Sequence, residues 1–461
     1  MPARSGGPFD LAIVFWPQLA LLCLGGAHGG EWDQYATESS MMRFTFISWH
    51  IAPWGGSEEL WSQAALRLRR EGHQVSACMP RFPNPSPKFL ALGKEGIQLH
   101  TPPRYHRLGV RAWRKFNRLL GQPTAESVWV RRQKPDLVVI SQPRFVADGD
   151  NLSPDADDGL SWMEICCDAD IPFIALVHNN GAEFWPGDAL RERLAAAYRA
   201  ARTVALVSRG NLEILERQIG ESLPNARLVW NPYKAPADQL PRWLAGNGNW
   251  KMACVARLDP NAKGQDLLFQ VLSHPRWQER PLELNLYGDG YCGCENGLRR
   301  LAEQFHLKNV HFHGHVNDVR MIWEQNHLLV LPSRFEGLPI VLVEAMWYGR
   351  PAMVTDVGGN AEVCVDGETG FVASAPAVEL LAETLERAWN RRDEWQRMGL
   401  AARARAEKLI PRDPVGDFCR QLQEIAETSH PAQASALAPV APLLAEDHAL
   451  NCGSVLEGRD R

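Results

Sequence analysis

Short apolar runs alternate with helix-length amphipathic segments along most of the chain after Met42. The apolar runs of the first half are Phe44–Ser48, Gln74–Met79, Leu137–Ser141, Phe173–His178 and Val204–Ser208. A second series comprises Lys251–Ala256, Leu282–Tyr287, Val310–His313, Leu328–Leu331 and Ala352–Thr355. Such alternation is typical of parallel strands joined by crossover helices. The pattern predicts an α/β protein with two Rossmann-like, doubly wound domains that face each other across a cleft.

The two series set the expected domain boundaries. The 461 residues exceed the roughly 250 to 300 at which a single core stops growing, which favours two domains. Between the two series, residues 231–250 are rich in proline, glycine and alanine and lack periodicity. We expect a first domain over 43–235, a linker over 236–250, a second domain over 251–410, a helix returning to the first domain over 411–428, and a mobile tail over 429–461.

Residues 1–42 precede the first predicted strand. Their apolar run, Leu11–Leu24, is interrupted by a proline and is shorter than the about 20 residues that span a bilayer. It loosely resembles a secretion signal. We favour the other interpretation, an unstructured extension upstream of a start at Met41 or Met42, because the strand pattern opens directly afterwards.

Composition and charge narrow the function classes. Apolar residues make up 45% and charged residues 22%, a balance typical of soluble globular proteins. A formal net charge of −5 excludes the global basic field that attracts nucleic acid, so no nucleic-acid partner is expected. The ten cysteines include no C-x-x-C pair, which favours a reduced, cytoplasmic setting. Cys166-Cys167 and Cys292-Gly293-Cys294 lack histidines at metal-site spacing, so we predict no metal site.

The richest motif follows the run Leu328–Leu331. In Ser333-Arg334-Phe335-Glu336-Gly337-Leu338-Pro339, a strand ends, a loop turns, and a helix over 340–348 begins near Pro339. Glu344 lies inside this helix among apolar residues, where an unpaired carboxylate costs several kcal/mol. A ligand would satisfy Glu344, and so would a neighbouring arginine such as Arg350.

At these residues the chain resembles the family 4 retaining glycosyltransferases, which have the GT-B fold. Glu336 to Glu344 match the family's E-x7-E motif. The other matches are Arg257 with Lys263-Gly264, Gly358-Gly359-Asn360-Ala361-Glu362, Gly55-Gly56-Ser57-Glu58, and His178-Asn179. The similarity covers roughly residues 43 to 425 in the family's order, which makes the set far more specific than any single motif.

The resemblance implies a retaining transferase that moves a hexose-type sugar from a nucleotide-sugar donor to a glycan or lipid-linked acceptor in surface polysaccharide or glycolipid synthesis. Glu336 would contact the donor sugar, Glu344 the ribose, and His178 the sugar near the breaking bond. Arg257 and Lys263 suit the growing charge of the leaving diphosphate, so we expect no metal or other cofactor. Further donor contacts are expected from Gly55, Gly56, His315, Val316, Gly337 and Leu338.

Two departures from the family pattern concern geometry rather than charge. Ala256 replaces a glycine before Arg257, and Asn231-Pro232-Tyr233 replaces the usual N-G-V at the end of the first domain. They affect the expected hinge and the placement of Arg257.

Other function classes rest on weaker signals. Gly288-Asp289-Gly290-Tyr291-Cys292-Gly293 fits the dinucleotide motif of an NAD-dependent oxidoreductase, although the next predicted strand ends without the acidic residue that would hold a ribose. A non-catalytic nucleotide-sugar-binding protein is a third class. Asp168-Ala169-Asp170 imitates a metal-binding D-x-D triplet that is too common to decide anything. A glycosidase pair is disfavoured because eight helical residues rise about 12 Å, beyond the spacing that glycosidases need.

A basic segment lies between Gly96 and Ala125, a stretch that contains no Asp or Glu. Arg104, Arg107, Arg111, Arg114, Lys115 and Arg118 fall within fifteen residues. Residues 110–120 have the pattern of a basic amphipathic helix. Residues 104–118 would receive an anionic lipid or phosphorylated glycan, or rest on the inner face of the membrane. The alternative is a helix that packs on its own domain.

Overall fold

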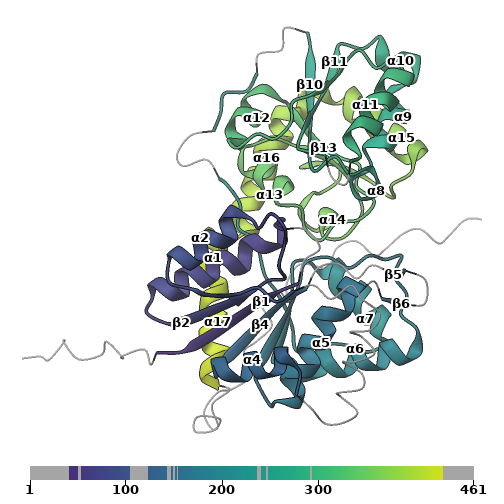
Figure 1. Ribbon diagram of the computed structural model, residues 1–461. Coiled ribbons are helices and arrows are strands. Elements are labelled where there is room, and N and C mark those ends of the chain that lie inside the picture. The colour runs from purple at the N-terminus through teal and green to yellow at the C-terminus, as the bar shows by residue number, and fades with distance from the viewer. Residues whose placement is uncertain are drawn as a thin grey trace, which may run out of the picture. The chain divides into compact units, whose positions relative to one another are not determined.

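The computed structural model describes residues 41–49, 53–103, 123–142, 147–148, 151–152, 154–235, 240–244, 248–290 and 293–428 (Figure 1). Residues 1–40 of the extension predicted over 1–42, the basic segment 104–118 and the tail 429–461 therefore lie outside the described residues. Within the described part, no helix combines the length and apolar character needed to cross a membrane.

The first sheet has seven parallel strands in the order β3-β2-β1-β4-β7-β8-β9. The strands are β1 (Arg43–Ser48), β2 (Gln74–Cys78), β3 (Gln98–His100), β4 (Leu137–Gln142), β7 (Phe173–Val177), β8 (Thr203–Leu206) and β9 (Ala226–Leu228). The central strands are rich in buried apolar residues because helices cover both faces of a parallel sheet. The first doubly wound sheet is confirmed. A separate antiparallel pair is formed by β5 (Ala147–Asp148) and β6 (Asn151–Leu152).

Alternating side chains of the first sheet pack into two hydrophobic cores, one on each face of the sheet. Phe44 and Phe46 pack with Trp61 on one face, whereas Ile47 packs on the other with Trp162. The covering helices are α1 (Ser57–Arg70) and α2 (Pro87–Lys94) on the first face, and α4 (Ala125–Gln133), α5 (Pro154–Asp168) and α6 (Asp188–Ala200) on the second (Figure 1). Helix α7 (Arg209–Ile219) follows β8. The period-two pattern of the strands thus accounts for both layers.

The second sheet has six parallel strands in the order β12-β11-β10-β13-β14-β15. The strands are β10 (Trp250–Val255), β11 (Leu282–Tyr287), β12 (Val310–Phe312), β13 (Leu328–Leu331), β14 (Ala352–Thr355) and β15 (Gly370–Ala373). The helices are α8 (Pro260–Lys263), α9 (Gln265–Leu272), α10 (Pro275–Gln278), α11 (Glu295–Gln304), α12 (Val319–Gln325), α13 (Ile340–Trp347), α14 (Asn360–Val363), α15 (Val378–Asn390) and α16 (Trp395–Leu409). This second parallel sheet is also confirmed.

The last described helix, α17 (Pro414–Thr428), packs against α1 of the first sheet (Figure 1). Phe418 and Leu422 belong to the same core as Phe44 and Trp61. Around them, Asp413 forms an ion pair with Arg67, and the Gln423 amide hydrogen-bonds the His73 ring at 3.0 Å. The amphipathic face of α17 is therefore buried on elements more than 300 residues earlier.

Candidate active site

Glu336 lies in the loop between β13 and α13, where a carboxylate is held almost out of contact with water. Its side chain is only 8% exposed, and its Oε1 accepts hydrogen bonds from Lys263 Nζ at 2.6 Å and from Ser333 Oγ at 2.8 Å. Arg334 fastens the same loop to α9 through a bidentate bond to Asp266, at 2.6 and 2.8 Å. The fold thus joins Lys263 and Glu336, which sequence analysis placed in separate motifs.

The two expected phosphate ligands follow β10, the strand next to β13. Lys263 ends α8, and Gly264 turns the chain into α9. The Arg257 side chain is 47% exposed, and its guanidinium lies 3.7 Å from the Asp259 carboxylate. Because parallel strands present their carboxyl ends at one edge, Arg257, Lys263 and Glu336 all lie at the carboxyl edge of the second sheet, the edge at which open α/β sheets usually bind ligands.

The dinucleotide-like glycine loop has a structural explanation in this arrangement. A methyl group on Gly288 would lie 2.0 Å from the Ala256 carbonyl oxygen, so only glycine permits the close approach. The Leu258 amide donates to the Asp289 carbonyl at 2.9 Å. The loop after β11 therefore holds the backbone on both sides of Arg257. Tyr291 and Cys292 lie outside the described residues.

Gly337 brings the Glu336 loop against the carboxyl end of the first sheet. Its Cβ, if it had one, would lie 1.9 Å from the carbonyl oxygen of His178, the residue directly after β7. The Asn211 side-chain amide donates to the Gly337 carbonyl at 3.2 Å, and the Asn180 backbone amide donates to Asn211 Oδ1 at 2.7 Å. His178 and Glu336 thus belong to one connected site.

Glu362 in the G-G-x-x-E turn caps a helix of the first domain. Its carboxylate accepts from the backbone amides of Gly210, at 2.8 Å, and Arg209, at 3.1 Å, at the start of α7. The free amides of a helix N-terminus favour a negative charge at that point. The Gly359 amide also donates to the Gly337 carbonyl at 2.7 Å. The turn therefore braces the Glu336–Gly337 loop and the first domain together.

Glu344 is buried in α13 with a backbone donor as its partner. The amide of Lys234, at the end of the first predicted domain, donates to Glu344 Oε1 at 3.1 Å. Pairing of Glu344 with Arg350 is wrong, because the Arg350 guanidinium donates to the carbonyls of Trp323, at 2.6 Å, and Asn326, at 2.9 Å. Burial raises the pKa of the Glu344 carboxyl to about 7.

Replacing Glu344 with glutamine should stabilise the ligand-free protein more at about pH 8 than at about pH 5. The folded-state pKa of about 7 exceeds the ordinary 4.5, so between these values the folded form keeps a proton that the unfolded form has lost. Wild-type stability therefore falls as the pH rises through this window, by an amount of the order of 3 kcal/mol. Glutamine does not titrate and keeps an acceptor for the Lys234 amide. Equilibrium urea unfolding at both pH values measures the difference, and an equal gain at both would contradict it.

The remaining predicted contacts occupy two loops. Gly56 caps α1 and would place a Cβ 3.6 Å from Ile340 Cδ1, at the start of α13. Its neighbour Gly55 belongs to the same turn. On the second domain, the His315 ring is exposed and hydrogen-bonds Asn317 Oδ1 at 3.2 Å. Lys234 Nζ donates to the Asn317 carbonyl at 2.9 Å. Lys234 thus links the His315 loop to Glu344.

Two apolar members of the predicted set face the interior. Leu338 is buried, and Val316 packs partly buried against the same core. The Leu338 side chain is therefore withdrawn from solvent, whereas Val316 keeps part of its side chain exposed. Among the described residues, no cluster of three or more His, Cys, Asp or Glu side chains is arranged to hold a metal ion.

Residues that carry the inter-element contacts were not singled out by sequence analysis. Asn180 and Asn211 are buried, and Ser208, expected to end a strand, instead caps α7 and accepts from the Asn211 amide at 3.3 Å. The only signal in the sequence was a serine before an amphipathic helix. This signal predicts a helix cap, but it does not indicate which groups Asn211 would contact.

Comparison with known proteins identifies the second domain. Residues 250–391 match the family model described as glycosyl transferases group 1. A Vi polysaccharide biosynthesis protein, VipC/TviE of Salmonella typhi, is 37% identical over 114 residues, which are 23% of this chain and 19% of that protein. A glycogen synthase of Alkalilimnicola ehrlichii is 32% identical over 146 residues, 30% of each chain. The chain thus spans less than a third of the length of these two relatives.

The fold comparison covers more of the chain. A crystal structure of Anabaena HepE in complex with UDP and glucose matches with a TM-score of 0.61 and 19% identity, over 84% of this chain and all of that one. At this identity the match concerns the fold alone, and the two parallel sheets agree with it. The second domain is thus that of a group 1 glycosyltransferase, and the two-sheet architecture is the GT-B fold expected from the sequence.

Proposed function

We propose that the protein transfers a hexose-type sugar from a nucleoside diphosphate donor with retention of configuration. The observation that carries the proposal is the Lys263–Glu336 pair at 2.6 Å, with Arg257 at the same sheet edge. Cleavage of the glycosyl–phosphate bond leaves a diphosphate whose negative charge grows in the transition state, and fixed cations at that point lower the barrier. Arg257 and Lys263 supply two cations without a divalent metal ion.

The Lys263–Glu336 pair can contact both sides of the glycosyl–phosphate bond, Lys263 the phosphate and Glu336 the sugar. An ammonium has three N–H donors, so Lys263 can keep its bond to Glu336 and still donate to a phosphate oxygen. The second carboxylate oxygen of Glu336 remains for a sugar hydroxyl. His178, joined to this loop at Gly337, would contact the sugar near the breaking bond. These roles explain why Glu336 is held in place by Ser333 as well as Lys263.

Glu344 is suited to the ribose end of the donor. Its Oε1 takes the Lys234 amide, and the other oxygen remains for ribose hydroxyls. The loop with His315 and Val316 would lie against the base, and Gly55, Gly56, Gly337 and Leu338 would offer backbone. We propose UDP as the nucleotide because the Anabaena HepE structure holds UDP and glucose.

The acceptor proposal is coarser. Similarity to the Vi polysaccharide biosynthesis protein favours a glycan or lipid-linked acceptor in surface polysaccharide synthesis. A cytoplasmic site at the inner face of the membrane, with contact through residues 104–118, stays a prediction.

Nucleotide binding tests the proposal directly. Calorimetry with UDP, GDP and ADP should show UDP binding, and Arg257→Gln and Lys263→Gln should each weaken it by about 1.5 to 3 kcal/mol, the range for hydrogen bonds to charged groups. Arg397→Gln removes an exposed arginine of the same domain and should leave affinity unchanged.

The other function classes predict different results. A non-catalytic sugar-nucleotide-binding protein would bind UDP but would not hydrolyse UDP-glucose. An NAD-dependent oxidoreductase would bind NADH instead of UDP. If all three nucleoside diphosphates fail to bind, or if neither substitution changes the affinity, the proposed diphosphate site is wrong.

A further inference from the structure

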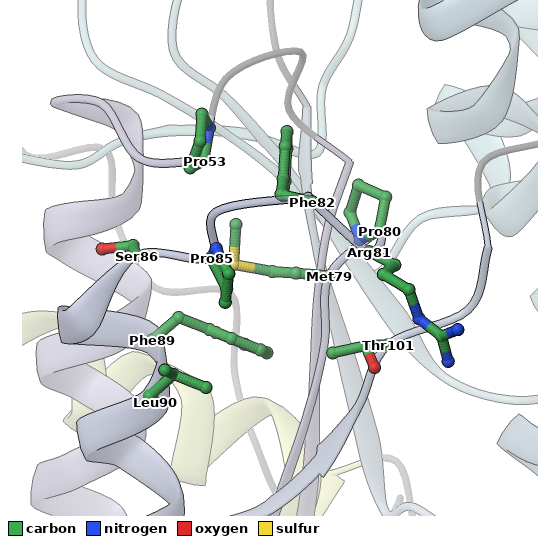
Figure 2. Close-up of a pocket in the computed structure, with 10 residues that line it drawn as sticks. All are labelled: Pro53, Met79, Pro80, Arg81, Phe82, Pro85, Ser86, Phe89, Leu90 and Thr101. Carbon is green, nitrogen blue, oxygen red and sulfur yellow. The ribbon is translucent and has the colours of Figure 1, made fainter.

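A small apolar pocket lies at the carboxyl edge of the first sheet, apart from the residues assigned to the donor. It has a volume of about 150 Å³, and a cavity of that size holds benzene. Its walls come from the ends of β2 and β3, the start of α2, and Pro53. Figure 2 shows Met79, Phe82, Phe89 and Leu90 around the space, with Pro53, Pro80 and Pro85. The pocket is therefore lined mainly by apolar side chains, with Arg81, Ser86 and Thr101 as its polar members.

The polar groups around the pocket are mostly engaged. Ser86 Oγ accepts from the Lys88 amide at 3.2 Å as the cap of α2. The Met79 amide donates to the His100 carbonyl at 3.1 Å, and the Arg81 amide to the Pro102 carbonyl at 2.9 Å. A sugar ring, with a hydroxyl on nearly every carbon, would leave those hydroxyls unpaired here, which costs free energy for each one. The lining favours an alkyl chain or an apolar ring.

One cation stands beside the apolar walls. Arg81 is exposed and lines the Thr101 side of the pocket (Figure 2). Within the part of the chain that the structure describes, no carboxylate is paired with its guanidinium. Leu90 is 48% exposed although it is a large apolar residue. An apolar space with an arginine at its rim matches an amphiphile with an anionic head.

The position of the pocket relates it to the donor site. Pro53 lies between β1 and the Gly55–Gly56 turn, and Gly56 approaches Ile340 at the start of the Glu344 helix. The sheet order β3-β2-β1 puts the pocket and this turn on the same edge. We propose that the pocket binds the apolar chain of the acceptor, with Arg81 holding an anionic group on it. Only the identification of the ligand as the acceptor rests on the proposed function. Binding of an anionic amphiphile to the pocket can be tested independently of it.

Binding of short alkyl phosphates to the full chain tests the inference. Calorimetry is run with saturating UDP, so that the diphosphate site is filled. n-Hexyl phosphate should bind one to one and at least tenfold more tightly than ethyl phosphate, because four more methylene groups leave water. Leu90→Glu should weaken n-hexyl phosphate binding at least tenfold. The matched control Leu400→Glu changes an equally exposed leucine of α16 and should have no effect.

A second pair of ligands isolates the charge at the rim. Arg81→Gln should weaken n-hexyl phosphate binding about tenfold, the scale for a hydrogen bond to a charged group, and leave hexan-1-ol binding unchanged. Arg132→Gln, an exposed arginine of α4, serves as its control. Equal affinities for hexyl and ethyl phosphate, or equal effects of Leu90→Glu and Leu400→Glu, would overturn the inference. Absence of UDP binding in the wild type would contradict the proposed function instead.

Discussion

Replacing Glu336 with glutamine is expected to lower turnover of the nucleotide-sugar donor about a hundredfold or more while the protein stays folded. Glutamine keeps the shape of the side chain and one acceptor oxygen, so Ser333 Oγ still has a partner. What disappears is the negative charge that faces Lys263 Nζ at 2.6 Å. The lysine is then no longer held in place by an anion, and the sugar loses a charged hydrogen-bond acceptor.

The matched control for Glu336→Gln is Glu379→Gln. Glu379 is an exposed carboxylate in the first turn of α15, in the same domain. Both variants should keep the wild-type circular dichroism spectrum, and only Glu336→Gln should lose turnover in a UDP-glucose assay. An unchanged rate in Glu336→Gln would remove this residue from the proposed site.

Replacing Gly337 with alanine should cost about a hundredfold in turnover for a steric reason. The added methyl group would lie 1.9 Å from the His178 carbonyl oxygen and 2.9 Å from Val207 Cγ2, so the loop must move by about an ångström. A displacement of that size at a reacting group costs on the order of a hundredfold in rate. The neighbouring Glu336 would move with it, although no charged or polar side chain is removed.

Gly297→Ala separates this effect from the general cost of adding a methyl group. Gly297 lies in α11, and a Cβ there would meet nothing within 4 Å. Alanine should stabilise that helix by up to about 1 kcal/mol and leave turnover unchanged. Thermal unfolding and donor turnover, measured on both variants, distinguish a local steric effect at Gly337 from a general effect of an added methyl group. Wild-type turnover in Gly337→Ala would show that the contact with His178 is not needed for activity.

Central strands were predictable from sequence, whereas of the four edge strands only β12 was predicted. β1, β4 and β7 are rich in apolar residues because both of their faces are covered. β3 and β9 have three residues each and lie at the two edges of the first sheet, so they carry too little periodicity to detect. β15 begins with a glycine and was also missed. Local pattern therefore predicts the centre of a sheet better than its borders.

The charged members of the candidate site were named from motifs, but their connections were not. The motifs indicated Lys263 and Glu336 separately, whereas their bond depends on β10 and β13 being neighbours. Asn211 was missed because a polar residue in an amphipathic helix usually faces water, and its partners here are backbone carbonyls. The Lys234 amide that meets Glu344 depends only on the path of the chain. Contacts to backbone leave no trace in the side-chain pattern.

The position of α17 has a consequence for the order in which the chain folds. Cys419 meets the Ala64 carbonyl across 355 residues, so the core around α1 is closed by a helix from the other end of the polypeptide. At about 5 to 20 residues per second, ribosomes need roughly 10 to 40 s to pass from residue 235 to residue 428. During that time the first sheet is translated but lacks its last helix, and the part of α1 that packs against α17 has no native cover. The half that is made first therefore completes its folding last.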